Sequence, residues 1–322
     1  MADGPGPVRL PENGGRSSSP ARHTTPDAPP IPGLAAAAGI RQRAAMHGTG
    51  TESEREEMEQ AMAIAVDFYA EIFASAEGAA ARAFVRDRGV PETIVARVRM
   101  GFAPNSWSAL RGRLRADGIS DAVGVSVGLL RAAEAGADDT YDAIRSRIIL
   151  PIRDAAGRTV ALGARAFGNA GGPKWLNSPT TPLYTKSEVL FGLDVAREMK
   201  PGTLVLVEGY FDALALLGAE IPSAAILGTS ISPTQSAMIV ERFPRVFVAL
   251  DGDDAGFAAA LRVAPELVAA GGRARIVRLP DGLDPDVVLR DRGRAAFVQA
   301  VLGSGSWHDV ALDSRLRKLN AL

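Results

Sequence analysis

Three short apolar runs in the C-terminal half of this 322-residue chain are each followed within a few residues by carboxylates. Helix-length stretches separate the runs, which is typical of buried parallel strands joined by right-handed helical crossovers. The runs and their acids are 204–207 followed by Glu208, 246–250 followed by Asp251 and Asp253, and 276–279 followed by Asp284 and Asp286. The pattern predicts a small doubly wound parallel sheet.

A parallel sheet places the carboxyl ends of its strands along one edge, so we expect the acids to converge. Two carboxylates about 4 Å apart repel by roughly 4 kcal/mol at an effective dielectric constant near 20, and divalent cations relieve this repulsion. The sequence therefore predicts a Mg²⁺ or Mn²⁺ site. Its candidate ligands are Glu208, Asp212, Asp251, Asp253, Asp284 and Asp286. The chain has no cysteine and only three scattered histidines, so no zinc is expected.

Each acidic cluster also has a purely structural interpretation. Glu208 and Asp212 suit the N-terminal end of a helix, Asp253 suits an N-cap, and the Asp284-Pro-Asp286 segment suits a turn. Gly252 is more specific, because a glycine between two acids permits close approach of backbone or ligand. Recurrence of acids after three strands of one sheet favours a shared metal site over three independent caps.

Composition sets the class of protein. The chain is 47% hydrophobic and 23% charged, enough apolar material for two domains, and no run approaches the roughly 18 apolar residues of a membrane span. We therefore expect a cytoplasmic protein without a membrane partner. The net charge is only −1, but eight arginines lie between positions 82 and 115 against Asp87 and Glu92. This stretch predicts a basic lobe that binds phosphates, with solvated helix faces as the alternative.

The predicted fold class is α/β, with an α+β N-terminal lobe before the doubly wound sheet. Residues 1–50 are rich in Pro, Gly, Ser and Ala, which predicts a disordered tail. The N-terminal lobe has predicted helices at 52–73 and 79–88, further helices up to 131, and a β-hairpin formed by 148–152 and 159–163, followed by an irregular loop at 168–184. The predicted domains are a basic lobe at 52–200, a metal-binding domain at 201–290 and a helical segment at 291–322.

The motifs resemble a known family. The acidic segments 208–212, 251–256 and 279–286 look like a Toprim domain, specifically that of DnaG-type bacterial primases. Upstream, the segments 84–90, 100–104, 141–148 and 173–186 resemble the RNA-polymerase core of those primases in the same order and spacing. The chain differs in two expected features: without cysteine it cannot form the usual N-terminal zinc ribbon, and too few residues follow Asp286 for a helicase-binding domain.

The resemblance implies synthesis of RNA primers from ribonucleoside triphosphates on a single-stranded DNA template. It implies that Glu208, Asp251 and Asp253 hold the catalytic metal, with Asp212, Asp284 and Asp286 in support. It also implies that Arg88, Arg165, Lys174 and Lys186 lie near template and nucleotide, with Lys174 acting in catalysis. A replicative helicase or a separate zinc-ribbon protein would then be a partner.

Two alternatives remain open at this stage. Toprim modules also serve nucleases and topoisomerases, so a phosphodiesterase is the first alternative. The second is a truncated, non-catalytic primase core that binds DNA or a helicase. The sequence contains no Gly-x-x-x-x-Gly-Lys-Ser/Thr loop, which argues against an intrinsic ATPase motor.

Overall fold

The computed structural model describes residues 51–133, 139–168, 170–280 and 282–320. All described residues belong to one compact unit. The predicted disordered tail at 1–50 lies outside the described residues. Among the helices that are described, none is long and apolar enough to cross a membrane.

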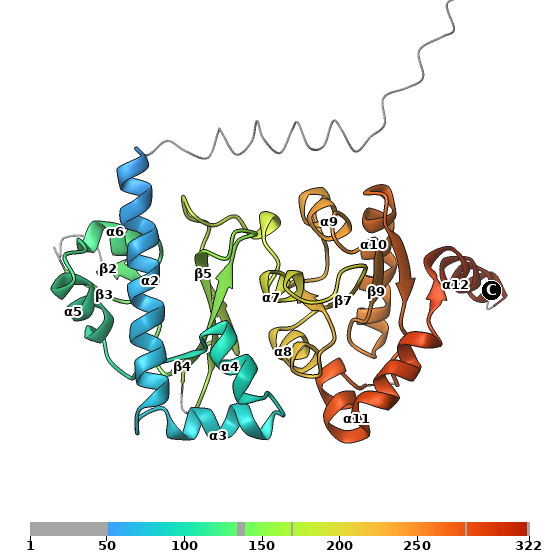
Figure 1. Ribbon diagram of the computed structural model, residues 1–322, viewed down its shortest axis with the longest axis horizontal. Helices are drawn as coiled ribbons and strands as arrows, with labels where there is room; N and C mark the ends of the chain where they lie inside the picture. Colours follow the sequence, from blue (N-terminus) through green and yellow to red (C-terminus); the bar gives the residue numbers. More distant parts are fainter. Residues whose placement is uncertain (1–50, 134–138, 169, 281, 321–322) are drawn as a thin grey trace, which may run out of the picture. The chain divides into compact units, whose positions relative to one another are not determined.

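The N-terminal lobe packs one long helix along an antiparallel sheet (Figure 1). Helix α2 (Glu52–Ala74) begins with a capping box formed by Thr51 and Glu54, and it buries Met62, Tyr69 and Phe73. Its bounds agree with the predicted helix. The strands of the sheet, in spatial order, are β1 (Gly101–Ala103), β4 (Arg147–Arg153), β5 (Thr159–Ala166) and β6 (Trp175–Asn177).

Shorter elements complete this lobe. They are α3 (Ala79–Asp87), α4 (Glu92–Val98), α5 (Ala109–Ala116), α6 (Asp121–Ser126) and the hairpin of β2 (Leu130–Ala132) with β3 (Thr140–Asp142). Helices dominate up to residue 131 as predicted, with the short strand β1 among them and β2 after α6. The loop predicted at 168–184 also contains a strand, β6, which pairs with β5.

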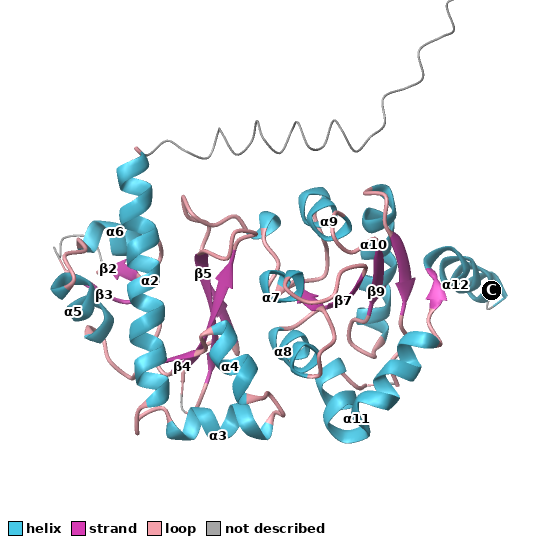
Figure 2. Ribbon diagram, in the orientation of Figure 1, coloured by secondary structure: helices cyan, strands magenta, loops and turns pink. Residues whose placement is uncertain are grey.

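The C-terminal part is the predicted doubly wound sheet (Figure 2). Its strands lie in the order β11-β10-β9-β7-β8, and all neighbours are parallel except β10 and β11. The elements from the connecting segment onward are η1 (Lys186–Glu188), α7 (Leu193–Arg197), β7 (Thr203–Val207), α8 (Tyr210–Gly218), β8 (Ser223–Ala225), α9 (Pro233–Val240), β9 (Arg245–Val248), α10 (Asp254–Ala269), β10 (Arg273–Ile276), α11 (Pro285–Leu302), β11 (Gly305–Ser306) and α12 (Trp307–Asn320).

The predicted limit between the metal-binding domain and the C-terminal segment falls inside a helix. Helix α11 begins after the N-cap Asp284 and continues past residue 290, with a kink at Gly293, whose φ is 79°. The buried side chains of the described residues form one continuous hydrophobic core. The domain limits 52–200, 201–290 and 291–322 therefore stay a sequence-based prediction.

Candidate active site

The carboxyl ends of the parallel strands deliver acids to one pocket. Glu208 follows β7, Asp251 follows β9, and Asp284 ends the loop after β10. They line a pocket of about 340 Å³ together with Asp212 and Asp286. The same pocket is lined on the side of the N-terminal lobe by Arg88, Arg165 and Lys174. Of the predicted site residues, these eight are brought together.

Burial first, and then mutual repulsion, raises the pKa of four carboxylates in this pocket. Burial raises the pKa of Asp212 to about 8, and the nearby charge of Asp286 adds to the effect. Asp251 has a pKa of about 6, again through burial first and the charge of Asp284 second. Burial likewise raises the pKa of Glu208 and of Asp284. The cluster therefore carries negative charge that the surrounding protein does not fully neutralise.

The donor set suits a hard divalent cation by its chemistry, since all candidate ligands are carboxylate oxygens. Within the described residues, no three His, Cys, Asp or Glu side chains are gathered closely enough to hold a metal ion by themselves. Mg²⁺ usually takes one or two carboxylates and completes its octahedral shell with waters and substrate phosphates. The cluster fits that mode of binding rather than a preformed all-protein cage.

Asp253 lies beside the main pocket rather than in it. Its Oδ1 accepts a hydrogen bond from the backbone N–H of Gly256 at 2.7 Å, so it is the N-cap of α10. It lines a neighbouring hollow of about 120 Å³ that also contains Asp251. Its charge contributes to the raised pKa of Glu208 and of Asp251. Asp253 therefore caps α10 and also lies close enough to the acidic cluster to affect its charge.

Gly252 permits the turn after β9 to approach the loop after β10. A methyl group at this position would lie 2.5 Å from the carbonyl oxygen of Pro280 and 2.7 Å from that of Leu283. Any larger residue would separate the two segments that carry Asp251 and Asp284. The sequence predicted that Gly252 permits close approach of backbone or ligand. In the structure, it is the backbone of the loop after β10 that approaches Gly252.

Aromatic rings hold two of the basic side chains. The Nη1 atom of Arg88 lies 3.1 Å from Oδ2 of Asp286, and its guanidinium lies 5.3 Å from the ring centroid of Phe211. The guanidinium of Arg165 is within 6 Å of three rings, those of Phe84, Trp175 and Phe211.

Arg165 is the more available of these two cations. Its Nε is buried without a hydrogen-bond partner among the described residues, and no carboxylate there pairs with it. Burial, and then the charge of Arg88, lower its pKa. Arg165 is a cation held in place by ring faces and suited to an incoming anion.

Lys174 is positioned by a buried arginine. Arg147 in β4 donates hydrogen bonds to the carbonyl oxygens of Gly171 at 2.8 Å and Pro173 at 2.9 Å, which fasten the segment just before Lys174. The charge of Lys174 acts on the cluster, because it lowers the pKa of Asp284 against the effect of burial.

Lys186 occupies a different place from the other predicted basic residues. It lies in η1 and lines a hollow of about 640 Å³ with Thr229 and Ser230. Gly228 borders both this hollow and the main pocket, and a methyl group there would lie 3.5 Å from Nζ of Lys186. The structure thus places Lys186 next to the pocket but outside it.

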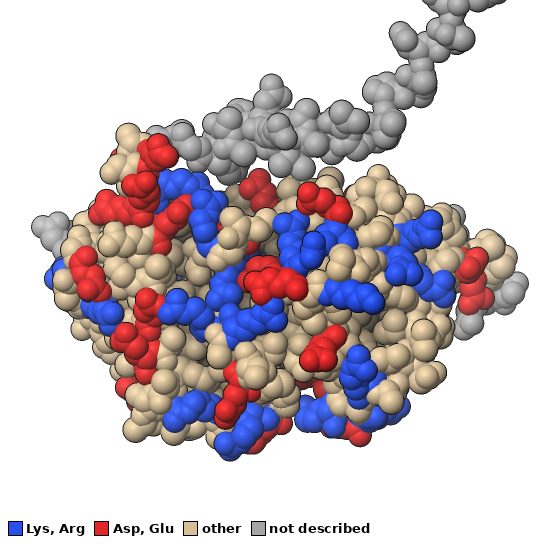
Figure 3. Space-filling model, viewed as in Figure 1, with Lys and Arg blue, Asp and Glu red and all other residues tan. Residues whose placement is uncertain are grey.

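Most arginines of the 82–115 stretch form ion pairs with acids outside the pocket. The ion pairs are Arg86 with Asp87, Arg97 with Glu198, Arg99 with Asp67, Arg111 with Asp139, Arg113 with Glu71 and Asp117, and Arg115 with Asp121. Of this stretch, only Arg88 lines the pocket. Figure 3 shows Lys and Arg side chains across the middle of the face in view with Asp and Glu among them. The alternative of solvated helix faces therefore describes most of the stretch.

The sequence reasoning missed an exposed aromatic and basic stack. Trp107 is 61% exposed, the guanidinium of Arg145 lies 3.6 Å from its ring centroid, and the ring of Tyr141 lies 5.4 Å away. It also missed Asn177, which lines the pocket and accepts a hydrogen bond from the hydroxyl of Tyr210 at 2.6 Å. The sequence signal that could have indicated the exposure of Trp107 is the lack of apolar periodicity around it.

Comparisons with known proteins agree with this geometry. Residues 68–197 match the model of the DNA primase catalytic core, N-terminal domain, and residues 205–289 match the Toprim-like model. The DNA primase of Myxococcus xanthus is 37% identical over 256 residues, which are 78% of this chain and 42% of that protein. The DNA primase of Salmonella typhimurium is 36% identical over 276 residues, 80% of this chain and 47% of that protein. The chain thus spans less than half the length of these relatives.

Solved structures cover most of the chain. The RNA polymerase domain of Mycobacterium tuberculosis primase DnaG is 31% identical with a TM-score of 0.73, covering 81% of this chain and 87% of that one. A DnaG primase catalytic domain bound to single-stranded DNA is 29% identical with a TM-score of 0.75, covering 83% and 85%. The chain therefore belongs to the DnaG-type DNA primase family and carries the catalytic core of that family.

Proposed function

We propose that this chain synthesises short RNA primers on single-stranded DNA by metal-dependent nucleotidyl transfer. One observation supports the proposal most strongly: five carboxylates face three basic side chains across a single pocket. Carboxylates with raised pKa suit a divalent cation, and basic side chains suit the oxygens of a triphosphate.

In the proposed reaction, the 3′-hydroxyl of the growing primer attacks the α-phosphorus of a ribonucleoside triphosphate, and pyrophosphate leaves. Glu208, Asp251 and Asp253 would hold Mg²⁺ or Mn²⁺, with Asp212, Asp284 and Asp286 in support. Bound metal would supply charge stabilisation for the attacking oxygen and for the leaving group.

The basic residues would orient the nucleotide. Arg165 has no carboxylate partner among the described residues, so it is free to bind phosphate oxygens without losing an ion pair. Lys174 lies beside Asp284 and would bridge triphosphate and metal site. Lys186, in the hollow next to the pocket, would contact the nucleotide or template further out.

The template would pass the exposed stack of Trp107 and Arg145. An exposed indole covered on one face by a guanidinium offers a stacking partner and a positive charge together, which is how proteins bind single-stranded nucleic acid. The solved relative bound to single-stranded DNA supports a DNA template. A helicase or a separate zinc-ribbon protein remains part of the proposal as a partner, as does a cytoplasmic location.

The upstream match favours primer synthesis over phosphodiester cleavage, because 68–197 matches the primase core rather than a nuclease. The full acid set likewise argues against a merely binding role.

Extension of labelled ribonucleotides on a single-stranded DNA template, with Mg²⁺ or Mn²⁺, tests the proposal. We expect product from the wild type, a loss of about 100-fold or more in Asp251→Ala, and a loss of 10-fold or more in Lys174→Ala. Asp254→Ala, which removes an exposed acid three residues along from Asp251, is the matched control and should retain activity. Absence of product even with a helicase and a zinc-ribbon protein supplied would support the binding role, and DNA cleavage without incorporation would support the phosphodiesterase.

A further inference from the structure

One face of the C-terminal sheet carries arginines at positions that are usually apolar and buried in a sheet of this kind. Side chains alternate between the two faces along a strand. Val246 and Val248 of β9, and Ala274 and Ile276 of β10, are buried on the side where α10 packs. The alternate positions are exposed or half-buried and line the other side: Arg245, Phe247, Arg273 and Arg275. We call these four residues the basic sheet face.

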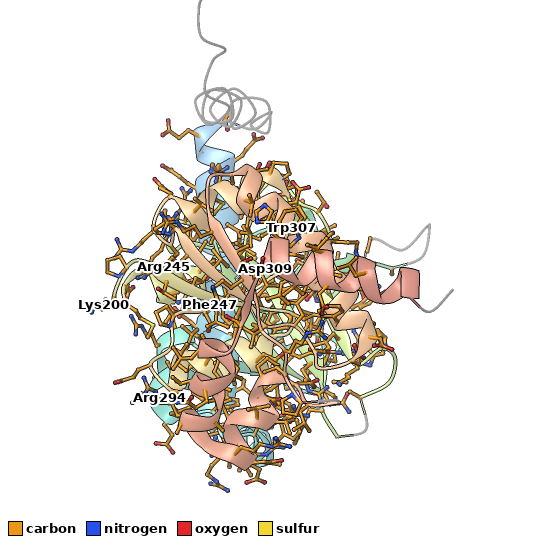
Figure 4. All side chains as sticks on the ribbon, turned by 90° about the vertical axis from the view of Figure 1, so that its right-hand side faces the viewer. Lys200, Arg245, Phe247, Arg294, Trp307 and Asp309 are labelled. Atoms are coloured by element: carbon orange, nitrogen blue, oxygen red, sulfur yellow. The ribbon has the colours of Figure 1, made fainter. Side chains whose placement is uncertain are left out.

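The strand register places these side chains next to one another. Arg245 is the cross-strand partner of Arg273, and Phe247 is the partner of Arg275. Helix α8 contacts mainly β7 and β8, and α12 contacts β10, but Arg245, Arg273 and Arg275 remain exposed. Two more exposed cations lie at its rim, because Gly202 exchanges backbone hydrogen bonds with Arg242 and Arg245, and Lys200 is close by in sequence. Figure 4 looks at the edge of the molecule that carries α12, and Lys200, Arg245 and Phe247 are labelled on the left of that view.

These cations lack carboxylate partners. Within the described part of the chain, no ion pair involves Arg245, Arg273 or Arg275, and Arg275 instead donates from Nε to the Ser304 hydroxyl at 3.0 Å. Two acids in this part of the chain are engaged elsewhere, since Glu241 pairs with Arg197 and Asp309 accepts a hydrogen bond from Ser306. Like charges directly opposite each other on neighbouring strands are destabilising. The pair of Arg245 and Arg273 therefore has a cost that an anionic ligand would remove.

We propose that the basic sheet face binds the single-stranded DNA template outside the catalytic pocket, a role that rests on the proposed function. A flat sheet face with an aromatic ring beside arginines suits a single strand, whose bases stack while its phosphates contact the cations. A duplex would hide its bases from Phe247. The RNA primer stays paired to the template, so the single strand present during synthesis is DNA.

The distance is suitable for one continuous strand. Asp251 lies six positions after Arg245, which is at most about 20 Å of extended chain. A template strand a few nucleotides longer than the pocket requires would therefore reach the basic sheet face.

Salt dependence of DNA binding tests this inference without metal or nucleotides, so it does not depend on catalysis. Fluorescence anisotropy with labelled strands of about 30 and about 8 nucleotides would compare wild type with Arg245→Ala/Arg273→Ala. Each lost phosphate contact lowers the slope of log K against log salt by about 0.7, so we expect a decrease of about 1.4 for the long strand and little change for the short one. Arg55→Ala/Arg262→Ala removes the same charge elsewhere and should leave the slope unchanged.

A fluorescent label provides the second measurement. Because the chain has no cysteine, Thr203→Cys creates a single labelling site on β7 at the strand partner of Arg245, with the arginines intact. Glu266→Cys on the exposed side of α10 is the matched control. We expect single-stranded DNA to change the emission of the label at 203 and not at 266.

Three results would overturn the inference. These are an unchanged salt slope in Arg245→Ala/Arg273→Ala, equal responses of the two labels, and tighter binding of RNA or an acidic peptide than of single-stranded DNA at position 203. An enzyme that makes no primers but shows the expected slopes would refute the proposed function and leave the binding surface intact.

Discussion

Asp212 shows at the level of one residue what the acidic pocket costs the protein. It is 8% exposed, and its Oδ1 accepts a hydrogen bond from the backbone N–H of Asp286 at 3.2 Å. The other carboxylates nearby oppose its ionisation. A buried negative charge in this position favours the unfolded state unless a cation binds next to it. The acidic pocket therefore lowers the stability of the metal-free protein while it provides affinity for a cation.

The pH dependence of stability follows from the sign of this shift. A carboxyl whose folded-state pKa is raised to about 8, well above the ordinary aspartate range, keeps its proton to higher pH in the folded state than in the unfolded chain. Its contribution to the free energy of unfolding is fully present below pH 4 and is lost as the pH rises to about 8. We expect Asp212→Asn to be more stable than wild type at pH 8 in EDTA, on the order of 2 kcal/mol, with the difference shrinking toward pH 5.

Urea denaturation at several pH values would measure this difference. Asp254→Asn, at an exposed position, is the control and should give a difference near zero at every pH. A constant offset for Asp212→Asn across the pH range would contradict the electrostatic explanation.

At the scale of elements, the turn after β9 depends on Gly252. The neighbouring loop presents backbone oxygens to this position, and backbone cannot move aside as a flexible side chain can. The packing of two loops, rather than any one side chain, therefore sets the spacing between Asp251 and Asp284.

Alanine substitutions at two glycines distinguish the backbone clash at position 252 from the general effect of replacing glycine by alanine. We expect Gly252→Ala to lower the free energy of unfolding by about 1 to 3 kcal/mol and to lower primer synthesis, because the clash separates the acids. Gly112→Ala in α5, where a methyl group meets nothing within 4 Å, should raise stability by about 0.5 to 1 kcal/mol. Thermal unfolding and the primer assay measure both, and equal stability of Gly252→Ala and wild type would count against this account.

At the scale of the whole molecule, one ion pair joins distant segments. Arg88 at the end of α3 and Asp286 in the first turn of α11 are 198 residues apart in sequence. The Asp286 side chain is 4% exposed and that of Arg88 is 32% exposed. Loss of the arginine would leave a buried carboxylate without its cation.

A double-mutant cycle tests this contact. We expect Arg88→Ala to lower the free energy of unfolding by about 2 to 3 kcal/mol, and the loss to be smaller when Asp286→Asn is already present. The Arg97→Ala and Glu198→Ala cycle, on an exposed pair, should give a coupling energy near zero. Additive effects of Arg88→Ala and Asp286→Asn would show that the pair is not coupled.

Divalent cations should stabilise the whole fold. Binding to the native state alone adds about 2.7 kcal/mol when the free metal is at 100 times its dissociation constant. We expect Mg²⁺ or Mn²⁺ to raise the Tm of wild type, and this shift to be lost in Glu208→Ala/Asp251→Ala. Asp291→Ala, which removes an exposed acid elsewhere, should keep the shift. An equal shift in all three proteins would mean that the metal binds outside the pocket.

The sequence by itself determined the parts of the fold that depend on local pattern. Apolar runs at 204–207 and 246–250 form strands, and the periodic apolar positions of 52–73 form a helix, because periodicity and capping act over a few neighbouring residues. The edge at which Glu208 and Asp251 meet follows from the topology of any parallel sheet.

Only the tertiary structure decided the pairings between distant segments. The three-residue strands β1 and β6 form because β4 and β5 provide hydrogen-bonding edges, and no local signal distinguishes them from loop. The separation of Lys186 from the pocket and the exposure of Trp107 beneath Arg145 likewise depend on how the loops pack. The basic sheet face needed the register of β9 on β10, since a shift of one residue would turn Arg245 toward the core.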